Sequence, residues 1–274
     1  MKFGFVLPYG DARTAAEYAY QAELTGWDAF FVWEPVWGID AWVTLTAAAM
    51  RTSRIRLGTM LSPLSRMRPW KLASETATLD NLSAGRVILS VGLGALDTGF
   101  EQFGEVTNRK KRAQLLDEGL DILIGLWKGQ PFNYLGKHYK IKETDFYPPP
   151  SPVQQPRIPI WVVGAWPFEI SMQRALHFDG LLPIAMDRQT HKIQEMTPSL
   201  LRQIVDYCAE HRPEGSVYDV IWEGQTPGGD ISKATEIVSL WENAGATWWN
   251  EAMWGIDDPA IVLERIQQGP PRIR

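Results

Sequence analysis

The side chains best placed for chemistry are isolated carboxylates, tryptophans and glycines that directly follow apolar runs of β-forming residues. The four histidines lie apart from one another and outside these positions. The pattern shows no cluster of histidines and cysteines for zinc, and no serine or cysteine nucleophile paired with a histidine base. Such a composition is typical of a site where an organic cofactor supplies the chemistry and the protein binds and orients it.

Glycine is informative at the end of a strand, because it lets the backbone approach a ligand closely. Tryptophans at the same positions would suit a flat aromatic ring, and packing beneath long loops is the alternative. These tryptophans are Trp33, Trp37, Trp166, Trp222 and Trp254. The other candidate positions at strand ends include Pro8, Glu34, Thr59, Met60, Leu61, Gly92, Leu93, Gly94, Gly164 and Ala165.

Eight strand patterns, each followed by a helical pattern, must position these residues. The predicted strands span 2–7, 28–32, 55–58, 87–91, 158–163, 180–184, 217–222 and 247–251. The predicted helices span 12–24, 41–51, 70–82, 108–126, 168–178, 190–211, 232–243 and 258–267. Eight such units predict an α/β protein with a (β/α)8 TIM barrel, whose active site lies at the C-terminal ends of the strands.

An open doubly wound sheet is the alternative, but the first strand is not followed by G-x-G-x-x-G. We expect one domain over residues 1–274, with an insertion at about 129–157, between the fourth helix and the fifth strand. This segment is too long for an ordinary helix-to-strand connection, and it includes a hairpin pattern around Leu135-Gly136.

The composition limits the choice of partners and compartment. The net charge is −5, which argues against a nucleic-acid partner. No apolar run approaches the roughly 18 residues that a membrane helix needs. Cys208 is the single cysteine, which excludes an internal disulfide and predicts a cytoplasmic location.

Several segments together resemble the luciferase-like monooxygenase superfamily. They are RIRLGTMLSP and ETATLDNLSAGRVILSVGLG within residues 54–94, followed by LDEGLDILIGLW and PRIPIWVVG. The resemblance implies a TIM barrel that binds reduced FMN or the deazaflavin coenzyme F-420 (F420). The reactions it implies are monooxygenation with dioxygen, or hydride transfer to or from the deazaflavin.

The resemblance also implies roles for individual positions. Members often have a non-proline cis peptide bond at the end of the third strand, here Met60-Leu61. The segment Gly92-Leu93-Gly94 matches backbone that runs beside the cofactor, and Gly164-Ala165-Trp166 matches a segment that holds the flavin phosphate. Arg66 and Arg68 are alternative phosphate partners. The predicted cofactor-binding set is therefore Pro8, Trp33, Thr59, Met60, Leu61, Gly92, Leu93, Gly94, Gly164, Ala165 and Trp166.

Three departures from the family pattern weaken the transfer of a specific activity. Many members have a histidine where Pro35 follows Glu34, and the sugar-phosphate dehydrogenases have a glutamate where Ala95 stands. The loop after the second strand is also short. We expect an FMN-dependent monooxygenase acting on a small organic substrate, with Glu34 as its catalytic residue.

Two other interpretations remain open. An F420-dependent reductase or dehydrogenase would need a basic groove for the anionic tail, for which the candidates are Arg66, Arg68, Lys71 and Arg188. A degenerate barrel that has lost its cofactor is the third interpretation.

Members of the family commonly dimerise, and we expect a homodimer.

Overall fold

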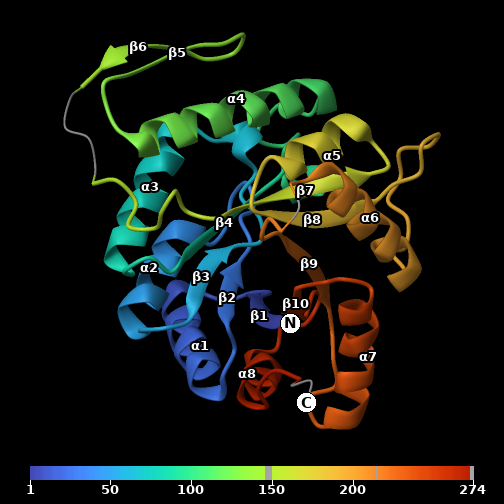
Figure 1. Ribbon diagram of the computed structural model, residues 1–274. Helices are drawn as coiled ribbons and strands as arrows, with labels where there is room; N and C mark the ends of the chain where they lie inside the picture. The colour runs from blue at the N-terminus through green and yellow to red at the C-terminus, as the bar shows by residue number, and fades with distance from the viewer. Residues whose placement is uncertain (146–149, 214, 272–274) are drawn as a thin grey trace.

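Eight parallel strands close into a barrel in the order β1-β10-β9-β8-β7-β4-β3-β2 (Figure 1). The structure is a computed structural model, which describes residues 1–145, 150–213 and 215–271. The closed barrel of parallel strands confirms the predicted TIM barrel. Its strands are β1 (Lys2–Leu7), β2 (Ala29–Val32), β3 (Arg56–Thr59), β4 (Val87–Val91), β7 (Ile160–Trp166), β8 (Gly180–Ala185), β9 (Asp219–Gly224) and β10 (Trp248–Ala252).

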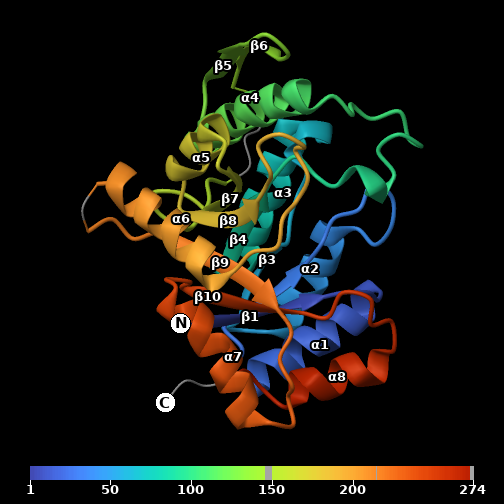
Figure 2. The same ribbon diagram turned by 90° about the vertical axis from the view of Figure 1, so that its right-hand side faces the viewer.

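A helix follows each barrel strand and packs on the outside of the barrel (Figure 2). Short 3-10 turns at Leu64–Arg66 and Leu96–Thr98 lie in the loops after β3 and β4. The helices are α1 (Ala12–Thr25), α2 (Ala41–Arg51), α3 (Pro69–Leu82), α4 (Arg109–Lys128), α5 (Glu169–Leu176), α6 (Pro198–His211), α7 (Ile231–Asn243) and α8 (Pro259–Gln267). None of the described helices is both long and apolar enough to cross a membrane.

Local signals in the sequence explain where these helices begin. The Asp11 side chain accepts hydrogen bonds from the N–H groups of Arg13 and Thr14, which caps α1. Asn108 caps α4 by accepting from the N–H of Lys111, 2.9 Å away. Such caps satisfy backbone donors that have no partner within the helix.

The sixth predicted helix was wrong at its N-terminal end. Residues 190–197 form a loop, and α6 begins at Pro198 with Thr197 as its cap. Proline suits the first turn of a helix but not its interior, because it lacks an N–H group. His191, expected in a helix, therefore lies in the loop after β8, with a φ of 55°.

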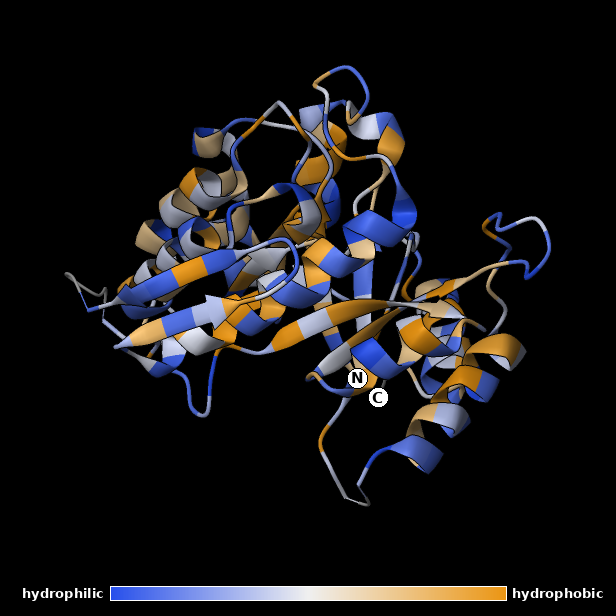
Figure 3. Ribbon diagram, turned by 90° about the horizontal axis from the view of Figure 1, so that it is seen from above, coloured by the Kyte–Doolittle hydropathy of each residue, from blue (hydrophilic) through white to orange (hydrophobic). Residues whose placement is uncertain are grey.

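Two hydrophobic cores follow from the alternation of side chains along the strands. Inside the barrel, Phe31, Trp161 and Trp248 pack together, with the two indole rings 5.1 Å apart between centroids. The second core lies between the strands and the helices and includes Trp249, whose side chain lies on the opposite face of β10 from that of Trp248. The helices carry both hydrophobic and hydrophilic residues, as expected for elements with one face on a core (Figure 3).

An antiparallel hairpin, β5 (Phe132–Leu135) and β6 (Lys140–Thr144), lies between α4 and β7 and beside α4 in both ribbon views. The Glu118 carboxylate of α4 accepts hydrogen bonds from the N–H groups of Lys137, His138 and Tyr139. The hairpin falls within the segment predicted as an insertion, of which residues 146–149 lie outside the described residues.

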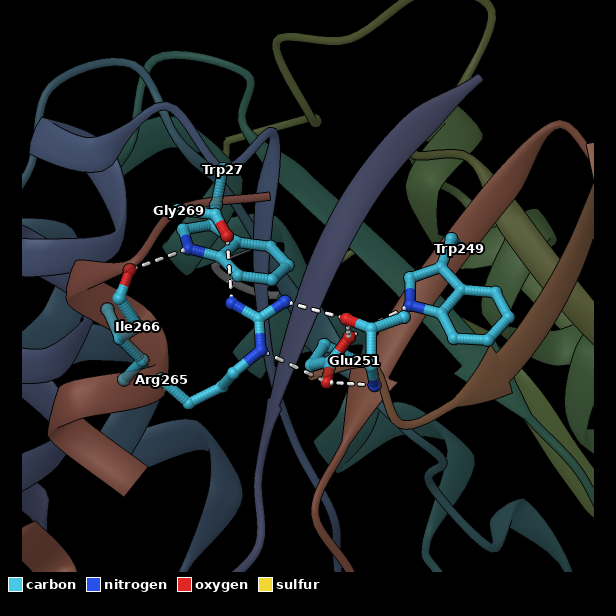
Figure 4. Close-up of polar contacts among 7 residues, drawn as sticks. Trp27, Trp249, Glu251, Arg265, Ile266 and Gly269 are labelled. Atoms are coloured by element: carbon cyan, nitrogen blue, oxygen red, sulfur yellow. Dashed lines mark hydrogen bonds and ion pairs between the residues drawn. The ribbon is translucent and has the colours of Figure 1, made fainter. Parts of the chain in front are cut away.

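A buried ion pair holds α8 against the barrel (Figure 4). Glu251 of β10 is fully buried, and Arg265 of α8 lies with its Nε 3.3 Å from Oε1 of Glu251. The carboxylate also accepts hydrogen bonds from the Thr226 backbone and hydroxyl and from the Trp249 indole. Glu251 therefore faces away from the barrel interior, and its role is to join β10 to α8.

Candidate functional site

A cavity of about 750 Å³ opens at the C-terminal ends of the strands and extends to α4 and α5. We call it the large lobe. It brings together most of the predicted site residues, although they come from four strand ends. Those that line it are Trp33, Glu34, Met60, Leu61, Gly92, Leu93, Gly94 and Ala165.

The floor of the large lobe is formed by the segment after β3. The peptide bond between Met60 and Leu61 is cis, as the family resemblance implied. A Cβ atom on Gly92 would lie 3.0 Å from the Leu61 side chain and 2.9 Å from that of Val163. Gly92 thus leaves the space that the Leu61 side chain occupies.

The loop after β4 forms a second wall. Gly94 has a φ of +79°, and a Cβ atom there would lie 2.7 Å from Pro63. Arg112 is buried, and its Nη1 donates hydrogen bonds to the carbonyl oxygens of Leu93 (3.0 Å) and Gly94 (2.9 Å). Burial lowers the pKa of Arg112, with a further contribution from the nearby charge of Arg109. The arginine therefore fixes the loop from the α4 side.

Glu34 is the acidic group of this cavity with a strongly altered pKa. Its Oε2 accepts a hydrogen bond of 2.6 Å from the Ser62 hydroxyl. Burial raises the pKa of Glu34 to about 7, although the Ser62 hydrogen bond and the charge of Arg66 oppose the shift. A carboxyl group with such a pKa exchanges protons at neutral pH, which suits a general acid or base.

Four predicted site residues do not line the cavity. Trp166 packs edge-on against Tyr207, and Gly164 faces α5, because strand β7 turns Val163 and Ala165 inward instead. Thr59 is fully buried, with its hydroxyl donating to the Ser90 carbonyl oxygen. The carbonyl oxygen of Pro8 accepts a 2.7 Å hydrogen bond from the Trp33 indole, so Pro8 orients a residue of the lining.

The tryptophans at the mouth divide into lining and packing residues. Trp33 and Trp254 line the large lobe, with ring centroids 6.3 Å apart and planes nearly perpendicular. Trp37 is 80% exposed and lies outside the lining. Only some of the tryptophans predicted at strand ends therefore line the cavity, and the others do not.

The basic residues of the cavity are not those that the sequence suggested. Three arginines line the large lobe from the helix side, namely Arg109, Arg112 and Arg174. Arg174 is paired with Asp117, whereas no described carboxylate lies within ion-pair distance of Arg109. The basic run at the start of α4 could have suggested these arginines. The sequence alone does not show, however, that the fold brings this helix beside the strand ends.

The arginines suggested by the sequence serve other contacts. Arg66 donates a 2.6 Å hydrogen bond to the carbonyl oxygen of Pro35 and so holds the loop after β2. Arg68 lies over the ring of Trp70, and Lys71 pairs with Glu75. Arg188 is exposed and does not line the cavity.

A smaller cavity of about 340 Å³, which we call the small lobe, adjoins the large lobe above β8 and β9. Both lobes share Met60, Leu61, Val163, Ile184, Ile193 and Trp254. Glu223 of β9 lines the small lobe, and its Oε1 accepts a 3.3 Å hydrogen bond from the Trp254 indole. Burial raises the pKa of Glu223, which the Trp254 hydrogen bond partly opposes.

The large lobe fits a flavin or deazaflavin cofactor in shape and donor chemistry. Apolar side chains and glycine backbone form the wall at the strand ends, which suits a flat ring. The arginines of α4 and α5 form the other wall, which suits phosphate groups. Among the described residues, no group of three or more histidine, cysteine or acidic side chains is arranged to hold a metal ion.

The sequence is similar to those of known proteins. A sequence model described as luciferase-like monooxygenase matches residues 1–203. An F420-dependent glucose-6-phosphate dehydrogenase of Amycolatopsis mediterranei is 33% identical over 165 residues, which cover 57% of this chain and 48% of that protein. The chain thus spans about half the length of this curated relative.

Solved structures show the same fold at low sequence identity. An F420-dependent secondary alcohol dehydrogenase, in complex with an F420-acetone adduct, superposes with a TM-score of 0.79 at 16% identity over 98% of both chains. A type II Baeyer-Villiger monooxygenase of Pseudomonas putida, in complex with FMN, gives a TM-score of 0.70 at 19% identity and covers 98% of this chain and 96% of its own.

Proposed function

Because the chain belongs to the luciferase-like monooxygenase family, we propose that it is an oxidoreductase that binds coenzyme F420 in the large lobe. The observation that carries the proposal is the pairing of an apolar wall at the strand ends with three arginines on α4 and α5. The anionic tail of F420 calls for such a basic wall. The curated relative named as F420-dependent supports the same choice of cofactor.

The residues of the large lobe have distinct tasks in this proposal. Bound F420 would supply hydride transfer to or from a small organic substrate. Leu61 and Gly92 shape the surface for a flat ring, while Arg109 and Arg174 bind the anionic tail. Glu34 holds or releases a proton at Oε1, since Oε2 accepts the hydrogen bond from Ser62.

FMN-dependent monooxygenation is the second candidate. Ala95 lines the large lobe at the position where the sugar-phosphate dehydrogenases of the family have a glutamate. A pocket with few bases suits chemistry in which the protein mainly excludes water and positions a substrate. The FMN-bound structural relative shares the fold that this candidate requires.

A cofactor titration distinguishes these candidates. Purified protein is titrated separately with F420 and with FMN, each oxidised and reduced, while tryptophan fluorescence is followed. Trp33 and Trp254 lie in the lining, so we expect a bound ring to quench their emission. A preference for F420 supports the proposal, a preference for FMN favours the monooxygenase, and no saturable response to either favours a degenerate barrel.

The arginine wall has a matched control on the same helix. We expect Arg109→Gln to weaken F420 binding, and Lys110→Gln to leave it unchanged, because Lys110 is exposed and outside the lining. A deazaflavin that lacks the anionic tail should bind equally to both variants. Equal F420 affinities would contradict the role of the arginine wall.

We also propose a homodimer in the cytoplasm. Val43 and Met50 of α2 and the neighbouring Trp37 are each more than 60% exposed, and a second subunit would cover such side chains. The single cysteine, Cys208, is buried, as suits a reducing compartment. Sedimentation of the wild type and of Met50→Glu tests the dimer.

A further inference from the structure

The small lobe lies directly beside the proposed cofactor site. It is bounded by β8, β9 and the loop after β8, and it shares the Met60-Leu61 segment with the large lobe. A molecule in the small lobe would therefore lie next to a ring held in the large lobe. At about 340 Å³, it is at the lower end of the volumes typical of ligand pockets.

The walls of the small lobe are almost entirely apolar. Among its described lining residues, Glu223 and Gln194 are the polar side chains, and no lysine, arginine or histidine is present. An anionic ligand would have no positive partner there, and its desolvation would be uncompensated. The remaining walls include Leu182, Pro183, Ala185, Met196 and Ile221.

Glu223 is held in a fixed position at the end of β9. It pairs in register with Asn250 of β10, and both side chains point into the barrel, as do Ile221 and Trp248 two residues earlier on each strand. Oε1 accepts from the Trp254 indole, and no described residue hydrogen-bonds Oε2. One carboxyl oxygen is thus free to contact a ligand.

We propose that the small lobe is the substrate subsite and that Glu223 hydrogen-bonds the reacting oxygen of a small, uncharged, mostly apolar alcohol or ketone. The proposal rests on the proposed function, because it takes the large lobe as the cofactor site. It also distinguishes this chain from a sugar-phosphate enzyme, since the lobe offers an anionic ligand no basic side chain.

The protonation state of Glu223 decides the charge of the subsite, because its neighbours carry none. The neighbours that face it are uncharged, namely Asn250 on β10, Ile184 on β8, Gln194 in the loop after β8, and Trp254. Across the Met60-Leu61 segment, Glu34 is the other acidic group near the shared wall whose pKa is raised. The neutral acid donates a hydrogen bond to an oxygen, whereas the carboxylate attracts a cation.

The test uses four probes with one ring and different polar groups. Cyclohexanol, cyclohexanone, cyclohexylamine and cyclohexanecarboxylate are titrated into cofactor-free protein, and binding is followed by ligand-observed NMR between pH 5.5 and 8.5. We expect the alcohol and the ketone to bind, and the ketone to bind less tightly to the ionised form of Glu223 than to its neutral form. The carboxylate should bind worst at every pH.

Variants assign the binding to Glu223. Glu223→Leu should weaken the ketone about fivefold, the loss of one hydrogen bond. Glu223→Gln should keep the affinity and lose the pH dependence, and it keeps the proposal testable if the leucine variant does not fold. Glu236→Gln, an exposed site on α7, is the control and should retain the pH dependence.

The outcomes separate this inference from the cofactor proposal. Tightest binding of cyclohexylamine, or unchanged ketone affinity and pH dependence in the Glu223 variants, would overturn the assignment. Because no cofactor is present, these results do not depend on F420. Failure of F420 to bind in the separate titration, with ketone binding intact, would refute the proposed cofactor and leave the subsite.

Discussion

Replacement of Glu34 by glutamine should stabilise the protein, and the gain should depend on pH. The glutamine amide keeps an oxygen that accepts the hydrogen bond from Ser62, so the packing is conserved. Glutamine cannot ionise, so the variant avoids the cost of a charged carboxylate in a buried position. We therefore expect a more stable variant at alkaline pH and almost no difference in acid.

The magnitude follows from the shift in the pKa of Glu34, from 4.5 for an ordinary glutamate to about 7 in the folded protein. A raised carboxyl pKa means that the folded state binds the proton more tightly than the unfolded state does. The resulting stability is present below pH 4.5 and is lost as the pH rises to about 7. The loss amounts to about 3 kcal/mol, since each pKa unit corresponds to about 1.4 kcal/mol.

Urea unfolding measures this effect directly. The free energy of unfolding of wild type and Glu34→Gln is determined at pH 5 and pH 8. We expect the variant to be more stable by about 1 kcal/mol at pH 5 and by about 3 kcal/mol at pH 8. Glu236→Gln, at an exposed site on α7, is the matched control for the loss of a carboxylate.

Two results would contradict this prediction. A difference between Glu34→Gln and wild type that is the same at pH 5 and pH 8 would mean that Glu34 ionises normally. A variant that is less stable than the wild type at pH 8 would mean that the carboxylate is stabilised by its surroundings. Glu34 would then be a poor candidate for proton exchange at neutral pH.

Three further predictions concern the loops, the scaffold and the basic wall. Gly94→Ala adds a Cβ atom 2.7 Å from Pro63, in backbone with a φ of +79°. We therefore expect weaker F420 binding and a lower melting temperature. Unchanged values would show that the loop adapts to the added atom. Glu251→Gln breaks the buried ion pair with Arg265 and should cost about 3–5 kcal/mol in urea unfolding, whereas a loss below 1 kcal/mol would contradict its structural role. Arg109→Gln should weaken F420 about fivefold at low salt and less at high salt, and a salt-independent loss would contradict an electrostatic contact.

The strands and most helices were predictable, because each has a local signal. The apolar run Val87–Val91 was predicted with its observed bounds, and Pro63 and Gly94 mark the loops that follow β3 and β4. The sixth helix failed at its start because an apparent helical pattern continued across Thr197 and Pro198. Those two residues carried the correct signal, a cap followed by a first-turn proline.

The site was predictable only where it depends on strand ends. Alternation along β7 turns Ala165 toward the cavity and Gly164 away from it, and a strict period of two would have shown this. The arginines of α4 could not be placed in the same way. Arg112 reaches the carbonyl oxygens of Leu93 and Gly94 only because the barrel brings α4 over the loop after β4.

The proposed binding of F420 is tested most directly by the affinity of the cofactor-free protein for F420 compared with FMN, measured by tryptophan quenching. Binding of F420 in the large lobe predicts saturable quenching by F420 in the micromolar range, weaker binding of FMN, and a loss of F420 affinity in Arg109→Gln but not in Lys110→Gln. A tighter complex with FMN, or no saturable response to F420, would contradict it.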